Sequence, residues 1–379
     1  MTSDGAVSDN PSLSDPEAAT VRLSIDLSAL AWNWRKMRDL SGSARCGAAV
    51  KADAYGVGMV KAAARLSREG CKDFFVADAN EGARLRRIVP GATIYVLNGA
   101  FDGAIATLRS HTLVPVLNSP DQVSVWRSHG GGAFALHIDT GMNRLGVTPA
   151  EARQLAEDPT FGPQLVLSHF ACSDMATHPL NRLQAETFAS CRLLFPHAEA
   201  SLANSAGILS GADIGYDLTR PGIALYGGEA ISGLDNPMRP VVTAQARVLM
   251  VRTAKAGQTV SYGATATLTR DSRIAVCGAG YADGYHRAGS GSGVALRTTG
   301  TPGAKVGFSG HLLPVIGRVT MDLTMVDVTD LPDAALAAGD WVELFGPTIS
   351  VDDAARAAGT IGYEMLTGMG RRHACSYLE

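Results

Sequence analysis

The sequence Cys46-Gly47-Ala48-Ala49-Val50-Lys51-Ala52-Asp53-Ala54-Tyr55-Gly56-Val57-Gly58 places a lysine at the end of a small, apolar run, directly before a glycine-rich turn. This pattern is typical of a buried strand that runs into a loop. Burial disfavours the ammonium form, so a lysine there can lose its proton near neutral pH and form a Schiff base with a carbonyl compound. Tyr55 could reach the same ligand. A strand-end lysine is, however, more often a surface residue whose amine extends into water, so the run by itself leaves both readings open.

The composition indicates a two-domain protein that binds a small molecule. The chain has 379 residues, 46% of them hydrophobic and 18% charged, which is enough for two cores. The net charge of −3 and the lack of basic runs interleaved with aromatic residues argue against a nucleic-acid partner. No apolar run reaches the roughly 18 residues of a membrane span, so we expect no membrane partner either.

The cysteines and the first residues indicate a cytoplasmic protein without a metal site. The six cysteines are scattered and form no Cys-x-x-Cys pair, which argues against both a zinc site and a disulfide framework. Residues 1–20 contain four acidic residues, no lysine or arginine and no apolar core, which is unlike a signal peptide. We expect these twenty residues to form a disordered tail.

The next 220 residues show a regular alternation of short apolar runs and helical stretches. Eight such units predict an α/β fold with eight parallel strands, a (β/α)8 barrel of the TIM type, over residues 21–240. Ser119-Pro120 and Thr148-Pro149 are typical of a helix cap followed by the first turn. The expected strands are residues 46–52, 74–77, 93–97, 113–117, 134–139, 165–170, 200–203 and 223–225.

The pattern changes near Pro240. Residues 241–379 alternate between β runs and glycine-rich turns, one of the expected strands being residues 294–298, and they end in helical stretches at 351–358 and 361–370. We therefore expect a second, mostly β C-terminal domain over residues 241–379.

Polar residues gather where the barrel strands are expected to end, which is the active face of such barrels. Small residues at 202–207 and 219–227 leave backbone N–H groups and a hydroxyl free to hold a phosphate. Taken singly, these two stretches are equally typical of tight turns. The candidate site residues at the strand ends are Lys51, Arg144, His169, Asn204, Ser205 and Arg220.

Seven motifs occur in an order that resembles the alanine racemases, pyridoxal phosphate enzymes of fold type III. They are AVKADAYG (49–56), HIDTGMNRLG (137–146), NSAG (204–207), RPGI (220–223), VSYG (260–263), GYADGY (280–285) and GRVTMD (317–322). The resemblance extends from about residue 21 to the C-terminus.

The resemblance implies that pyridoxal 5′-phosphate is bound covalently to Lys51 and that Arg220 faces its ring nitrogen. A guanidinium group only donates hydrogen bonds and stays charged, so the ring nitrogen must accept and remain unprotonated. Such a ring is a weaker electron sink than a pyridinium, which favours quick return of a proton to Cα over transamination. The implied cofactor-binding residues are Lys51, Tyr55, Arg144, His169, Asn204, Ser205, Arg220, Gly222, Ile223 and Tyr363.

Racemisation needs proton transfer on both faces of Cα, so two bases are required. By resemblance Lys51 serves the D-enantiomer and Tyr262 the L-enantiomer, with His169 and Arg220 as the means of lowering the tyrosine pKa from about 10. Tyr262 would come from a second subunit, which implies a homodimer with shared active sites. The implied substrate-binding residues are Arg144, Met321, Asp322 and Tyr281, with Tyr281 and Tyr363 narrowing the entrance for small amino acids.

Each of these residues also has an ordinary structural reading. Tyr262 could be a strand tyrosine, His169 a core histidine, Met321 core filler and Asp322 a turn residue.

One departure from the family pattern stands out: His137 occupies a position where many members have a carbamylated lysine that holds the arginine equivalent to Arg144. Histidine cannot form that carbamate, so Arg144 needs another acceptor or an anion.

The function implied is that of an isomerase that interconverts L-alanine and D-alanine and supplies D-alanine for cell-wall precursors. A racemase of the same family that prefers serine or other small amino acids would share every motif. A non-catalytic pyridoxal phosphate homeostasis protein is the alternative from another class, but such proteins resemble the barrel alone.

Overall fold

The computed structural model describes residues 17–211, 216–294, 302–370 and 372–379. The chain forms two compact units, one made of Leu27–Arg239 and the other of the segment that ends at Asp26 together with Pro240–Glu379. We describe each unit by itself. Of the expected N-terminal tail, residues 1–16 lie outside the described part of the chain.

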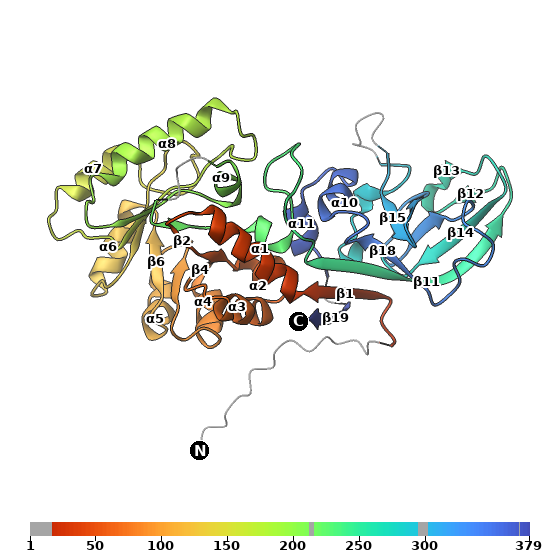
Figure 1. Ribbon diagram of the computed structural model, residues 1–379, viewed down its shortest axis with the longest axis horizontal. Helices are drawn as coiled ribbons and strands as arrows, with labels where there is room; N and C mark the ends of the chain where they lie inside the picture. Colours follow the sequence, from red (N-terminus) through yellow and green to blue (C-terminus); the bar gives the residue numbers. More distant parts are fainter. Residues whose placement is uncertain (1–16, 212–215, 295–301, 371) are drawn as a thin grey trace, which may run out of the picture. The chain divides into compact units, whose positions relative to one another are not determined.

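The first unit contains a parallel sheet whose strands follow one another in sequence order. Strands such as β4 and β6 are buried along their whole length, as expected for a parallel sheet covered on both faces. The helices lie outside the strands (Figure 1). The strands are β3(Ala48–Ala49), β4(Asp73–Val76), β5(Thr93–Val96), β6(Val114–Leu117), β7(Ala135–His137), β8(Leu165–Leu167) and β9(Glu199–Ser201).

Two short strands close the barrel. β10(Leu218–Thr219) pairs in parallel with β2(Arg45–Cys46), which lies directly before β3 in the chain. The Gly47 N–H donates to the Thr219 carbonyl over 3.0 Å, and on the other side the Arg220 N–H donates to the Ala203 carbonyl over 2.9 Å. These bonds join β10 to both ends of the sheet and complete the expected TIM-like barrel.

The prediction of the eighth strand at residues 223–225 is wrong. This run forms a 3-10 helix, η1(Ile223–Tyr226), and the eighth strand is β10, which lies five residues earlier. All four η1 residues are buried. A short apolar run has no periodicity that separates a buried strand from a buried helical turn, which explains the error.

The barrel helices begin where the cap signals predicted. The Ser119 hydroxyl accepts the Gln122 N–H, and Thr148 and Glu151 form a reciprocal capping box. The helices are α1(Leu27–Leu40), α2(Lys51–Tyr55), α3(Met59–Arg68), α4(Ala79–Arg86), α5(Asp102–Ser110), α6(Pro120–Ser128), α7(Pro149–Ala156), α8(Pro179–Arg192) and α9(Ser205–Leu209).

The second unit is built around the long strand β11(Val242–Ala254), visible in Figure 1. It pairs antiparallel with β1(Val21–Asp26), β18(Trp341–Phe345) and β14(Ser272–Cys277), and β14 pairs in turn with β17(Thr324–Asp327). The remaining elements are β12(Thr259–Val260), β13(Ala266–Thr267), β15(Lys305–Phe308), β16(His311–Pro314), β19(Ala374–Leu378), α10(Val351–Ala357), α11(Gly362–Thr367), η2(Tyr262–Ala264), η3(Tyr281–Asp283) and η4(Arg287–Gly289).

The assignment of residues 21–26 to the barrel differs from the structure. Val21, Leu23 and Ile25 are buried on one face of β1, which lies between β11 and β19 in the second unit. The expected strand at residues 294–298 falls mostly within residues 295–301, outside the described residues. None of the described helices has both the length and the apolar character needed to cross a bilayer.

Candidate active site

Lys51 lies at the carboxyl end of β3, where the barrel sheet gives way to the first loop. The preceding Val50 N–H donates to the Phe75 carbonyl over 2.9 Å, so the strand keeps its pairing up to the lysine. Burial and the positive charge of Arg144 lower the Lys51 pKa, while the negative charge of Glu81 opposes them. These shifts favour the neutral amine, the form that can attack a carbonyl group.

Tyr55 and Gly222 approach each other closely beside this lysine. A Cβ on Gly222 would lie 2.3 Å from the Tyr55 hydroxyl, so this position has room only for glycine. The Tyr55 ring is stacked on Tyr226, with 4.6 Å between ring centroids, and is buried. The Gly222 N–H donates to the Ser205 hydroxyl over 2.8 Å. The fold thus brings three of the expected phosphate-binding residues together.

Asn204 and Ile223 complete this group in different ways. The Asn204 side chain caps α9 by accepting the Gly207 N–H over 2.9 Å, so it places Ser205 at the start of the helix. Among the described residues, the Ile223 N–H has no hydrogen-bond acceptor. A hydroxyl, a free backbone N–H and a close-fitting glycine suit a phosphate group.

Arg220 is buried beside these residues without a carboxylate partner in the described part of the chain. It donates to the Ser201 hydroxyl and the Ser168 carbonyl, and its Nη2 lies 3.5 Å from Nδ1 of His169. Burial lowers its pKa to about 10, so the group remains charged at neutral pH. Burial and the Arg220 charge hold the His169 pKa well below its usual range, which keeps this histidine neutral.

Arg144 lies on an exposed loop that Asp139 holds in place. The Asp139 carboxylate accepts the N–H groups of Gly141, Met142 and Asn143 over 2.8 to 2.9 Å. The Arg144 charge lowers the pKa values of Lys51, His137 and His169, which indicates that it lies near all three. Asp139, just after the barrel strand β7, thus fixes the loop that carries Arg144.

The donor set as a whole suits an anionic ligand that carries a carbonyl group. Alongside burial, the charges of Lys51, Arg144 and Arg220 all lower the His169 pKa, so three basic side chains act on one histidine, and the Ser205 hydroxyl accepts the Gly222 N–H. A buried arginine without a carboxylate partner is stabilised by any anion that enters its surroundings. The barrel unit can therefore hold a phosphorylated aldehyde or ketone, with Lys51 as its covalent attachment point.

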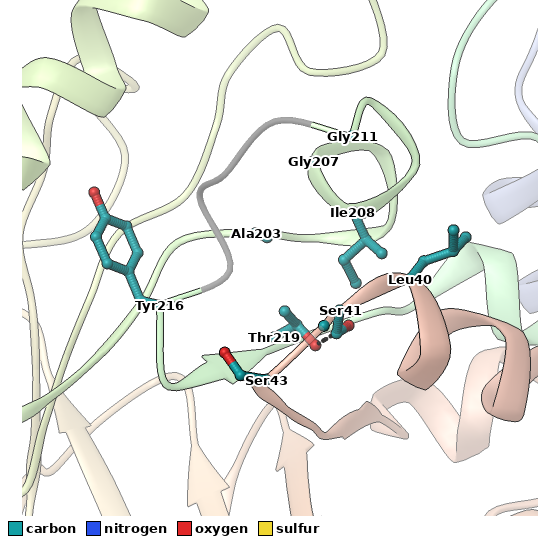
Figure 2. Close-up of a pocket in the computed structure, with 10 residues that line it drawn as sticks. Leu40, Ser41, Ser43, Ala203, Gly207, Ile208, Gly211, Tyr216 and Thr219 are labelled. Carbon is teal, nitrogen blue, oxygen red and sulfur yellow. Dashed lines mark hydrogen bonds between the residues drawn. The ribbon is translucent and has the colours of Figure 1, made fainter.

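A cavity of about 350 Å³ opens elsewhere in the barrel wall and is shown in Figure 2. On its edge the hydroxyls of Ser41 and Thr219 lie 2.9 Å apart and satisfy each other. None of its lining residues is a candidate site residue. They are Leu40, Ser41, Gly42, Ser43, Ala203, Gly207, Ile208, Gly211, Tyr216 and Thr219.

The second unit presents Tyr262 on a turn with unusual backbone angles. The Tyr262 side chain is 73% exposed, and Ser261 and Gly263 on either side have φ of +67° and +76°. The Ser261 hydroxyl donates to the Arg318 carbonyl over 2.8 Å, and a Cβ on Gly263 would lie 2.8 Å from the Arg318 guanidinium. The turn is thus fixed while its tyrosine remains accessible.

Tyr281, Met321 and Asp322 lie together in the same unit. The Tyr281 N–H donates to the Thr320 carbonyl over 3.0 Å, and Tyr281 and Met321 are both partly exposed. Arg372 donates to Asp322 over 2.8 Å and to the buried Asp283 over 3.0 to 3.1 Å. Tyr363 lies on α11 of this unit and is 39% exposed.

Glu81 contacts the turn after Lys51, although no sequence motif indicated it as a site residue. Asp78 and Glu81 have the spacing of a capping box, a signal that predicts a bond from Glu81 back to the Asp78 N–H. Asp78 does cap α4, but the Glu81 carboxylate accepts the N–H groups of Ala52 and Ala77 instead. The capping-box spacing thus predicted the start of α4 correctly, but it did not predict the contact between Glu81 and Ala52.

Fold and site together define a class of enzyme, a (β/α)8 barrel with a strand-end lysine for a phosphorylated carbonyl cofactor, followed by a β-rich unit. Two family models match this chain: "Alanine racemase, N-terminal domain" over residues 25–230 and "Alanine racemase, C-terminal domain" over residues 241–377. The chain belongs to the alanine racemase family.

Individual relatives agree with this assignment. The alanine racemase of Rhizobium meliloti is 52% identical over 369 residues, 95% of this chain and 97% of that protein. The biosynthetic alanine racemase of Agrobacterium fabrum is 53% identical over 370 residues, 96% of this chain and 95% of that protein. The crystal structure of alanine racemase from Bartonella henselae with covalently bound pyridoxal phosphate superimposes with a TM-score of 0.87 at 35% identity, covering 95% of this chain and 100% of that one.

Proposed function

We propose that this protein interconverts L-alanine and D-alanine with pyridoxal 5′-phosphate carried on Lys51, and so acts as an isomerase. The observation that carries the proposal is a strand-end lysine whose pKa is lowered by burial and by Arg144, in the same barrel as the Ser205 and Gly222 pair that suits a phosphate. The match of the C-terminal family model over residues 241–377 argues against the alternative of a barrel-only cofactor carrier.

We assign the cofactor to the residues that the family motifs indicate. Lys51 would hold its aldehyde carbon, and Tyr55, Ser205, Gly222, Ile223 and Tyr363 would hold its phosphate, with Asn204 fixing Ser205. Arg220 would donate to the ring nitrogen and Arg144 to the phenolic oxygen, and His169 lies against Arg220. When bound, the cofactor supplies an electron sink that acidifies the Cα proton of the amino acid.

The chain's own residues then move protons on the two faces of Cα. On one face Lys51 would accept the proton as the neutral amine or deliver one as the ammonium; on the other, Tyr262 would accept it as the phenolate or deliver one as the hydroxyl. We assign substrate binding to Arg144, Met321, Asp322 and Tyr281, with the Met321 backbone N–H toward the substrate carboxylate and Asp322 beside it. The exposure of Tyr262 fits a side chain that completes a site beyond its own unit.

We further propose a homodimer in which Tyr262 of one subunit serves Lys51 of the other. Mixing Lys51→Ala and Tyr262→Phe chains tests this directly, since each mixed dimer would contain one site with neither substitution. Statistical mixing should restore about a quarter of the wild-type activity. If both residues acted within one chain, the mixture would remain as inactive as its parents.

The central experiment is chiral chromatography of L-alanine after incubation with each protein and pyridoxal phosphate. We expect D-alanine from the wild type, essentially none from Lys51→Ala and a severe loss with Tyr262→Phe. A wild type that fails to racemise alanine, or a fully active Tyr262→Phe protein, would contradict the proposal. Parallel incubations with L-serine and other small amino acids define the substrate range.

The cellular role is proposed on narrower support. The word biosynthetic in the name of the Agrobacterium relative fits a supply of D-alanine for cell-wall precursors. All six cysteines are free in the structure, which fits a reducing compartment such as the cytoplasm.

A further inference from the structure

The turn that follows Lys51 has the opposite hand to an ordinary helix. Ala52, Asp53, Ala54 and Tyr55 have φ between +53° and +56°, although none of them is glycine. For L-residues this conformation costs about 1–2 kcal/mol each, so four in succession need strong support from their surroundings. Lys51 and Tyr55, at the two ends of this turn, are both residues to which we assign the cofactor.

The carboxylate of Glu81 supplies that support. Oε1 accepts the Ala52 N–H over 2.6 Å, and Oε2 accepts the Ala77 N–H over 2.8 Å. One side chain from α4 thus joins the turn after β3 to the loop after β4. Backbone N–H groups that donate to an ionised carboxylate form stronger hydrogen bonds than those that donate to a neutral acceptor.

The bond to Ala52 acts directly on Lys51. The Ala52 N–H belongs to the peptide group that joins Lys51 to Ala52, and this group is planar. An acceptor that holds this N–H therefore fixes the orientation of the peptide group immediately after Lys51. That orientation sets the direction in which the lysine side chain leaves the backbone.

A second carboxylate, that of Asp53, joins the same turn to the start of the next helix. Asp53 accepts the Met59 N–H over 3.0 Å, and Arg84, also on α4, lies 3.8 Å from Asp53. Helix α4 thus contacts two successive residues of the left-handed turn through Glu81 and Arg84. Glu81 contacts the residue next to the lysine, and its charge also opposes the effect of burial and of Arg144 on the Lys51 amine.

We propose that Glu81 is a positioning residue for Lys51, which holds the left-handed turn through the Ala52 N–H and so directs the lysine amine into the active site. The proposal rests on the proposed racemase function. It concerns the geometry of the attachment point, and Glu81 itself touches neither substrate nor cofactor in this role.

The test begins with Glu81→Gln, which preserves size and shape. Its amide nitrogen must face either Ala52 or Ala77, and the N–H group there loses its acceptor. We expect kcat to fall on the order of 10- to 100-fold with a much smaller change in KM, because small misplacements of reacting groups have effects of this size. Hydrogen exchange of the peptide that contains residues 51–56 should become faster in the apoprotein, a readout independent of activity.

Glu151→Gln is the matched control. Glu151 is also a first-turn glutamate of a barrel helix that accepts a backbone N–H, that of Thr148 over 2.7 Å, but it serves α7. This variant should lose helix-cap stability while kcat and hydrogen exchange at residues 51–56 stay as in the wild type. An equal loss of kcat in both variants would mean that Glu81 acts only through general stability and would overturn the proposal.

Combining Glu81→Gln with Ala52→Gly tests the mechanism. Glycine adopts positive φ without a steric cost, so it should stabilise the turn and restore part of the lost kcat. Absence of rescue, or unchanged exchange at residues 51–56 in Glu81→Gln, would contradict the positioning role. A wild type without racemase activity would instead contradict the proposed function, so the two failures are distinguishable.

Discussion

The side-chain oxygen of Asn118 lies 2.9 Å from Nδ1 of His137. The Asn118 amide nitrogen donates to the carbonyls of Val116 and Leu97 over 2.7 and 3.0 Å, so the amide cannot be reversed. Its oxygen must therefore accept from His137, and Nδ1 carries the proton. Nε2 of the neutral ring is then an acceptor, and the charge of nearby Arg144 contributes to keeping the ring neutral. Nε2 of His137 is therefore the ring atom that can accept a hydrogen bond in place of a carbamate oxygen.

The His137 pair predicts a pH dependence of stability. Burial and the charges of Arg220 and Arg144 lower the His137 pKa from 6.5 to about 4. Between these values the unfolded chain binds a proton that the native state does not, so stability present above pH 6.5 is lost as pH falls toward 4. Two and a half pH units correspond to about 3 kcal/mol for this one group. Denaturant unfolding of the wild type and of His137→Gln from pH 7 to pH 4 measures this contribution. We expect the free energy of unfolding to fall less steeply with decreasing pH in the variant. Equal slopes would contradict the assignment, because His169 contributes to both proteins alike.

Gly222→Ala should weaken cofactor binding. The new Cβ would lie 2.3 Å from the Tyr55 hydroxyl, and the stacked, buried Tyr55 ring has little freedom to move aside. Overpacking of about 1–3 kcal/mol corresponds to roughly a 5- to 150-fold higher Kd for pyridoxal phosphate. Absorbance titration of the apoprotein measures this change. Gly91→Ala is the control, because a Cβ there meets no atom within 4 Å. Identical Kd values for the two variants would contradict the prediction.

Gly146→Ala should displace the loop that presents Arg144. Gly146 has φ of +114°, and a Cβ there would lie 2.6 Å from the Asp139 backbone nitrogen, so both conformation and contact oppose a side chain. We expect a loss of about 2 kcal/mol in unfolding free energy and a higher KM for alanine. Gly42→Ala separates the two causes, since Gly42 also has positive φ but a Cβ there meets nothing within 4 Å. It should cost only about 1 kcal/mol, and KM should not change.

Arg372→Gln should destabilise the second unit around Tyr281. The variant removes the guanidinium from Asp283, whose side chain is 5% exposed and also accepts the Gly280 N–H over 2.9 Å. A buried carboxylate without its cation costs about 1–3 kcal/mol, seen as a lower Tm. Arg356→Gln is the control variant. Both side chains of the Arg356–Asp353 pair are exposed, so this pair should contribute about 0.5 kcal/mol or less to stability. A smaller effect at Arg372 than at Arg356 would be contrary to this reading.

Local sequence patterns determined much of this protein. The alternation of apolar runs and helices predicted the barrel, and Ser119-Pro120 and Thr148-Pro149 marked their helix starts correctly, because capping depends on residues three apart. The stretches around Lys51, Ser205 and Arg220 were each open to an ordinary structural reading, and only the order of seven motifs, through the family resemblance, implied a phosphorylated carbonyl cofactor.

Long-range contacts decided the rest. β1 joins the second unit because its pairing partners β11 and β19 lie more than two hundred residues further along the chain, a relation that no local pattern carries. The same holds for Glu81, which contacts Ala52 across 29 residues while its own spacing indicates a capping box. The left-handed turn after Lys51 carries backbone strain, and beyond its local hydrogen bonds the folded barrel adds a carboxylate that accepts the Ala52 N–H.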